Sequence, residues 1–171
     1  LPAPPTLADD LEQCVRTFRR AAARRANAAS HGEGQAALDA LVALGDPEAC
    51  EAIGQEFAQC VQRLGEVESE QQRVRARLAQ GQRVVDGLTL RVQKDESLAE
   101  VLKDQVRAAE GLTRRLRELE EKGEALRPWK RAVAGGAGRL LTQLSDSRKR
   151  SALKEIWRQA EKGEMWTARL A

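Results

Sequence analysis

A heptad spacing of apolar residues begins at Ile53, and it constrains the fold more than any other feature of the chain. The steps between successive positions alternate between four and three residues, which is the spacing of a helix that packs along another helix. We call these positions the first seam, and a polar residue and a glycine interrupt its apolar character. The first seam comprises Ile53, Phe57, Cys60, Leu64, Val67, Gln71, Val74, Leu78, Gly81, Val85, Leu88 and Val92.

The pattern restarts after the polar stretch 94–97 as a second seam. Ser97 and Glu100 have the spacing of a helix capping box. Two alternatives are therefore open: one helix over residues 48–126 that stutters at 94–97, or two helices with a break there. The second seam comprises Leu98, Leu102, Gln105, Ala109, Leu112, Leu116 and Leu119.

A continuous helix over residues 48–126 would be roughly 120 Å long, at about 1.5 Å per residue. Such a rod cannot bury its own apolar positions. It needs a second long helix from the same chain, a second copy of the chain, or both. We therefore predict that the apolar residues of both seams are core or dimer contacts, and that the long helices form a homodimer or heterodimer.

The composition agrees with a helical fold. Only 3% of the 171 residues are aromatic, none is Tyr, and 32% are charged. Good helix formers dominate, and no alternating strand pattern with turn residues is present. We predict an all-α fold, an elongated antiparallel three-helix coiled coil that forms a dimer.

Helix boundaries follow from turn residues. We expect residues 1–5 to be a proline-rich linker remnant of a longer protein and residues 6–171 to form the coiled-coil domain. The helices are predicted at about 6–44, 48–126 and 139–170, with a loop or weak point at 30–34. Gly45-Asp46-Pro47 is a stop-and-restart signal. Pro128, reinforced by the glycines of 135–138, predicts a break before the last helix.

No residue pattern indicates catalysis. The cysteines Cys14, Cys50 and Cys60 are scattered, and the sole histidine, His31, lies in a predicted surface loop. These residues lack metal-ligand spacing, and no nucleophile with a base or Gly-rich phosphate loop is present. We predict a protein that is not an enzyme and uses no metal or cofactor. The odd cysteine count favours a reducing, cytoplasmic location, and no run of about 20 apolar residues could cross a membrane.

Positive charge is concentrated near the C-terminus. Residues 127–171 contain eleven Lys and Arg against four Asp and Glu, a net charge of +7, so the rest of the chain carries −4. This asymmetry indicates an anionic partner. Trp129 could insert at a lipid interface or pack at a helix corner. The candidate anion-binding or membrane-binding residues are Lys122, Arg127, Trp129, Lys130, Arg131, Arg148, Lys149 and Arg150.

Small and leucine residues from Ala37 to Leu44 precede Gly45. Together with apolar residues of the first seam, this stretch resembles the BAR domains of sorting nexins, whose first helix often ends in this way. The chain departs from the family in having no Tyr and in its short last helix. The other residues that carry the resemblance, within residues 35–95, are Ile53, Phe57, Cys60, Val67, Val84, Val85, Leu88 and Val92.

The resemblance implies a crescent-shaped dimer that binds and shapes anionic endosomal membranes in protein transport, peripheral to the membrane. Each basic residue near anionic lipid contributes about 1 kcal/mol. The alternative hypothesis is a coiled-coil scaffold or tether that binds only proteins, which explains the seams equally well. Nucleic-acid binding is disfavoured, because no aromatic residues interleave with the basic ones.

Overall fold

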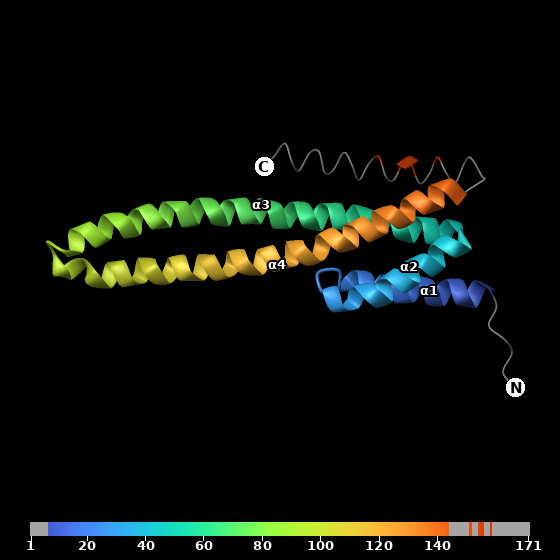
Figure 1. Cartoon of the computed structure of the whole chain (residues 1–171), viewed down its shortest axis with the longest axis horizontal. Coiled ribbons are helices and arrows are strands. Elements are labelled where there is room, and N and C mark those ends of the chain that lie inside the picture. The colour runs from blue at the N-terminus through green and yellow to red at the C-terminus, as the bar shows by residue number, and fades with distance from the viewer. Residues whose placement is uncertain (1–6, 144–150, 152–153, 156–157, 159–171) are drawn as a thin grey trace, which may run out of the picture. The chain divides into compact units, whose positions relative to one another are not determined.

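The computed structural model describes residues 7–143 together with residues 151, 154, 155 and 158. The regular elements in these residues are all helical, which confirms the all-α prediction (Figure 1). They are α1 (Leu7–Ala23), the short 3₁₀ helix η1 (Ala28–Ser30), α2 (His31–Leu44), α3 (Pro47–Val92), the 3₁₀ helix η2 (Glu96–Leu98) and α4 (Ala99–Gln143).

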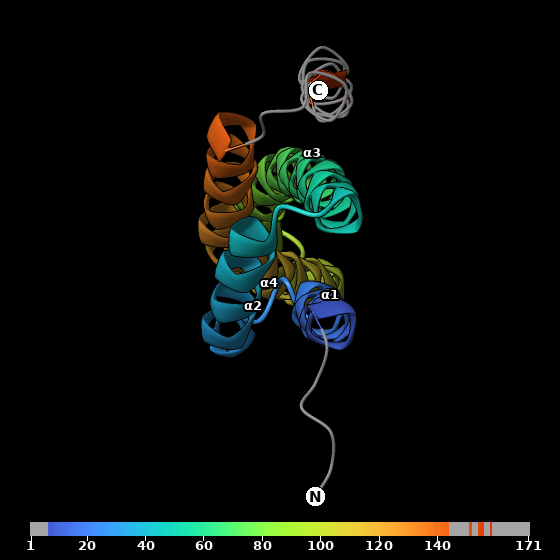
Figure 2. The ribbon, with the colours of Figure 1, turned by 90° about the vertical axis from the view of Figure 1, so that its right-hand side faces the viewer.

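The chain divides into two compact units. The hairpin unit spans Glu66–Lys122, and the base unit contains the described residues on either side of it, 7–65 and 123–143. The base unit has a continuous hydrophobic core to which four helices contribute, and α1 packs directly on α2 (Figure 2). The largest fully buried side chains of that core are Phe18, Leu38, Leu41, Ile53, Cys60, Trp129, Val133 and Leu140.

The helices of the base unit end where the sequence supplies caps. Gly45 has a φ of 61° and donates its N–H to the Leu41 carbonyl, and only glycine adopts this left-handed conformation without strain. The Asp46 carboxylate accepts a hydrogen bond from the Glu48 N–H at 3.0 Å. The predicted stop and restart at Gly45-Asp46-Pro47 is therefore confirmed.

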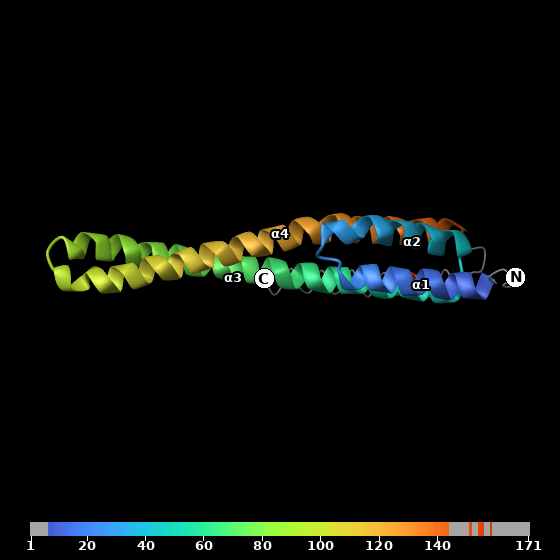
Figure 3. The same ribbon diagram turned by 90° about the horizontal axis from the view of Figure 1, so that it is seen from below.

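In the hairpin unit, residues 66–92 of α3 and 99–122 of α4 lie antiparallel, as Figures 1 and 3 both show. The helices are joined at Asp95, whose carboxylate accepts hydrogen bonds from the hydroxyl and the backbone N–H of Ser97. These hydrogen bonds lower the pKa of Asp95. The break predicted as an alternative at 94–97 is thus real, with Asp95 as its cap in place of the predicted Ser97–Glu100 box.

The two seams are mirror images about Asp95. Val92 and Leu98 are equally distant from it along the chain, and the same holds for Leu88 and Leu102 and for every later pair. An antiparallel hairpin that turns at Asp95 therefore brings each first-seam position level with a second-seam position. The seam residues of the hairpin unit are all buried or half-buried, whereas most other residues there are exposed.

Two predicted boundaries are wrong. The helix expected over 6–44 is divided between Ala23 and His31, because Asn27 caps η1 with its side-chain oxygen. The break expected at Pro128 is absent, since α4 continues through it to Gln143. Pro128 lies on the exposed side of α4, while the adjacent Trp129 and the residues one, two and three turns on are buried in the core. That burial outweighs the lost hydrogen bond.

The last helix predicted at 139–170 is not a separate element where it is described. Residues 139–143 belong to α4, and Leu140 is fully buried. The remainder of that prediction falls outside the described residues, apart from the isolated positions 151, 154, 155 and 158.

Candidate interaction surface

The hairpin unit leaves much of its apolar seam uncovered. Only Gln71, Val74, Leu88 and Leu119 are buried among its seam positions. The others are half-buried: Val67, Leu78, Gly81, Val85, Val92, Leu98, Leu102, Gln105, Ala109, Leu112 and Leu116. Two helices cover each other along one line only, so apolar seam side chains remain partly in contact with water.

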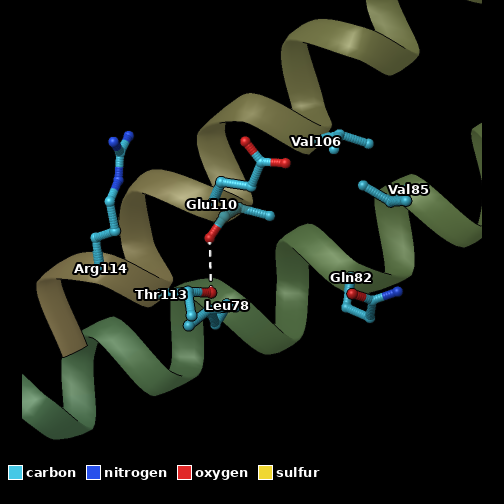
Figure 4. Close-up of a pocket in the computed structure, with 8 residues that line it drawn as sticks. Leu78, Gln82, Val85, Val106, Glu110, Thr113 and Arg114 are labelled. Atoms are coloured by element: carbon cyan, nitrogen blue, oxygen red, sulfur yellow. Dashed lines mark hydrogen bonds between the residues drawn. The ribbon is translucent and has the colours of Figure 1, made fainter. Parts of the chain in front are cut away.

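A groove of about 460 Å³ lies between α3 and α4 on one flank of this unit (Figure 4). Its apolar lining is Leu78, Val85, Val106 and Ala109. The rim is polar and comes from Gln82, Glu110, Thr113 and Arg114. The Thr113 hydroxyl donates to the Ala109 carbonyl at 2.9 Å, the dashed line in Figure 4.

Two small residues lie level with each other in the two seams, and one of them, Ala109, lines the groove. Gly81 and Ala109 are equally distant from Asp95, so the mirrored register places them at the same level of the hairpin. A Cβ atom built on Gly81 would meet no atom within 4 Å. Larger residues at this level would fill the space between the helices, and the hairpin is therefore locally under-packed.

Large apolar side chains are also exposed on this unit. Val84 is 38% exposed, Val101 45%, Val106 37% and Leu90 67%. These are the exposed large hydrophobic residues among the described residues, and all four belong to the hairpin unit. Sequence reasoning identified the seams but missed Leu90, Val101 and Val106, because none of the three is a seam position. The mirrored register was the signal that could have located the groove.

Two ion pairs link α3 and α4 within the hairpin unit. The Arg115 guanidinium donates to Glu70 at 2.7 and 2.9 Å and to Glu118 at 3.2 Å, and these carboxylates raise the pKa of Arg115. Arg75 lies 3.7 Å from Glu120. All four side chains of the two cross-helix pairs are at least one-third exposed, so water and salt screen both pairs.

The base unit contains a buried polar cluster of Arg25, His31, Glu56 and Trp129. Arg25 donates to Glu56 at 2.7 and 3.0 Å, and the Trp129 indole N–H donates to the same carboxylate at 3.4 Å. His31 stacks on Trp129 with ring centroids 5.4 Å apart, and its Nε2 lies 2.8 Å from the Arg25 carbonyl oxygen. His31 begins α2, so the prediction of a surface loop histidine is wrong.

Burial dominates the electrostatics of this cluster. It raises the pKa of Glu56, and Arg25 opposes the rise. Burial also raises the pKa of the Cys60 thiol to about 12, with the Glu56 charge adding to the effect. A thiol with so high a pKa is not a nucleophile at neutral pH. The cluster links the turn that follows α1 to α2, α3 and α4.

The candidate anion-binding or membrane-binding residues fall into three groups. Lys122, Arg127 and Arg131 are exposed, and Lys130 is half-buried. Trp129 is 1% exposed and packs in the core, so its insertion into lipid is ruled out in this fold. Arg148, Lys149 and Arg150 lie outside the described residues.

Within the described residues, no group of three or more His, Cys, Asp or Glu side chains could hold a metal ion. No helix in the same part of the chain is long and apolar enough to span a membrane. The chain matches no protein-family model, no curated protein and no solved structure. The resemblance to BAR domains therefore stays a prediction.

Proposed function

We propose that this chain is a non-enzymatic helical module that assembles with other polypeptides through its hairpin unit, as a scaffold or tether does. The observation that carries the proposal is the under-packed hairpin, with its half-buried seam, its groove and its exposed valines. Such a surface is a site of protein contact in a water-soluble protein. Exposed apolar side chains at helical spacing fit a partner helix.

The charge of the hairpin unit favours a protein partner over an anionic surface. Residues 66–122 contain twelve Lys and Arg and twelve Asp and Glu, so their net charge is zero. A neutral surface with interspersed charges neither attracts anionic lipid over long range nor repels another protein of mixed charge. The seam and the groove are the attractive features that remain.

Photo-cross-linking in the cells that make the protein tests this function. A benzoylphenylalanine at Val106, on the groove, is expected to form adducts with a helix of another polypeptide. The matched control is the same residue at Gly87, which is exposed and has no atom within 4 Å of its Cβ position. Equal adduct yields at both positions, or none at Val106, would refute the proposal.

Membrane binding is the second candidate, and the positive charge of residues 127–171 together with the exposure of Arg127 and Arg131 favours it. The proposed form is a dimeric antiparallel coiled coil that binds and shapes anionic endosomal membrane. Liposome co-sedimentation at two salt concentrations tests it, with Lys130, Arg131, Arg148, Lys149 and Arg150 changed to Glu as the loss variant. Liposome binding that changes neither with the salt concentration nor with these substitutions would rule out this electrostatic mechanism.

A further inference from the structure

We propose that the partner of the hairpin unit is a second copy of this chain, whose α4 lies antiparallel on α4 along the groove. The two-fold axis passes between Gly111 and Leu112. This inference rests on the proposed function and names the partner. Its basis is a stripe of surface residues on α4. When a second α4 lies antiparallel on this stripe, the side chains that meet are complementary in charge or shape.

The stripe lies beside the second seam and borders the groove. Its residues follow one another at steps of three and four, so they form one line along the helix surface. Val106, Glu110 and Thr113 of the stripe line the groove, as Figure 4 shows. The whole stripe is Lys103, Val106, Glu110, Thr113, Arg117 and Glu120.

A two-fold interface requires a surface that matches itself, because each residue contacts the residue at the reflected position of the copy. Lys103 and Glu120 are equally distant from the axis and have opposite charges. Glu110 is related in the same way to the uncharged Thr113, so no like charges meet near the axis. Val106 is related to Arg117, whose aliphatic stem can cover it. The reversed stripe thus contains no pair of like charges.

The pairing also covers apolar side chains that the hairpin unit leaves partly exposed. An α4 helix of the copy laid along the stripe covers the groove floor at Leu78, Val85 and Ala109. The zero net charge of residues 66–122 means that two hairpins do not repel each other.

Charge reversal tests the geometry. Lys103→Glu would place two acidic residues opposite each other at both ends of the stripe, and Glu120→Lys would place two basic ones. We expect each variant of the full chain to raise the dimer dissociation constant by about tenfold or more, measured by sedimentation equilibrium. Arg107→Glu, a reversal on α4 outside the stripe, is the matched control and should leave the dimer unchanged.

Mixing the two variants gives the decisive result. A chain with Lys103→Glu and a chain with Glu120→Lys are complementary at both ends, so the mixture should form a heterodimer although each variant alone dissociates. Circular dichroism checks that each variant remains helical. Lys103 and Glu120 are surface residues whose ion pairs within the chain, with Glu100 and Arg75, are exposed, so neither change should unfold the hairpin.

Three results would each overturn this two-fold arrangement. They are a wild-type chain that stays monomeric, a dimer dissociation constant that neither charge reversal changes, and a mixture of the two variants that forms no heterodimer. The proposed function has its own readout in the Val106 cross-link. A monomer that still cross-links through Val106 to a different polypeptide would refute the self-pairing and leave the assembly function standing. A monomer without cross-links would refute both.

Discussion

Removing the Arg25 side chain isolates the energetic role of the buried polar cluster. Glu56 is 3% exposed and Arg25 is 18% exposed, so the carboxylate depends on the guanidinium much more than the reverse. Breaking a buried ion pair from one side costs about 3–5 kcal/mol, because an unpaired charge remains buried. We expect Arg25→Met to lower the free energy of unfolding by about 3 kcal/mol. This value is the low end of that range, because the Trp129 indole N–H still donates to Glu56.

A second substitution separates the pair from the packing. Replacing both partners of a buried ion pair with apolar residues is often close to neutral. The double variant Arg25→Met with Glu56→Leu should therefore be more stable than Arg25→Met alone, and within about 1 kcal/mol of the wild type. Glu56→Leu alone should cost about 1–2 kcal/mol, since the partly exposed guanidinium can reach water.

The loss in Arg25→Met should depend on pH. Burial raises the folded-state pKa of Glu56 above its ordinary value of 4.5, and removal of Arg25 raises that pKa further. The folded chain then holds the proton more tightly than the unfolded chain does. The resulting stability is present below pH 4.5 and is lost as the pH rises through the folded pKa. The destabilisation should thus be smaller near about pH 4 than near about pH 7.

Urea unfolding measured by tryptophan fluorescence can follow this unit alone. Trp157 and Trp166 are changed to Phe, so that Trp129 in the core is the remaining fluorophore. The electrostatic account would be refuted by a loss under about 1 kcal/mol at neutral pH. A loss of the same size at both pH values, or a double variant no better than Arg25→Met, would also refute it.

Two further predictions concern the same unit. Gly34→Ala should destabilise the protein by about 1–2 kcal/mol in thermal or urea unfolding, because the new Cβ would lie 2.5 Å from the Trp129 ring. Gly32→Ala is the control, and it should be neutral or stabilising because its new Cβ would meet no atom within 4 Å. Half-buried Cys14 should react with a thiol reagent at about pH 8 long before Cys60, whose burial raises its pKa to about 12. Equal rates in the folded protein would contradict the buried position of Cys60.

The seams could be predicted because their spacing is local information. Steps of four and three place Leu88 or Leu112 on a helix stripe whatever the rest of the chain does, and the structure keeps all these residues at least half-buried. The polar cluster could not be predicted in this way. Arg25 and Glu56 are 31 positions apart and join the turn after α1 to α3, and no local pattern encodes that contact. Arg25 is also one of five arginines within residues 16–25, so its position in the sequence does not single it out.

Pro128 shows where local rules fail for a physical reason. A proline inside a helix costs about 3 kcal/mol, mainly through a missing hydrogen bond and a clash one turn earlier. Trp129, Val133, Ala137 and Leu140 are almost completely buried on the opposite side of α4. Burying a single large apolar side chain contributes about 1.5–3 kcal/mol. Several such side chains therefore outweigh the proline, and the helix continues where propensity alone predicts a break.

The small and polar residues in the seams limit how much apolar surface the hairpin unit buries by itself. Gln71 and Gly81 each give up apolar burial that a leucine would provide, and the small Ala109 of the second seam lines the groove. A polar seam residue costs stability but restricts which helices pack in register. A hairpin optimised for its own stability would carry leucine at both positions. The proposed interface thus rests on departures from the heptad pattern, such as Ala109 in the groove, rather than on the pattern itself.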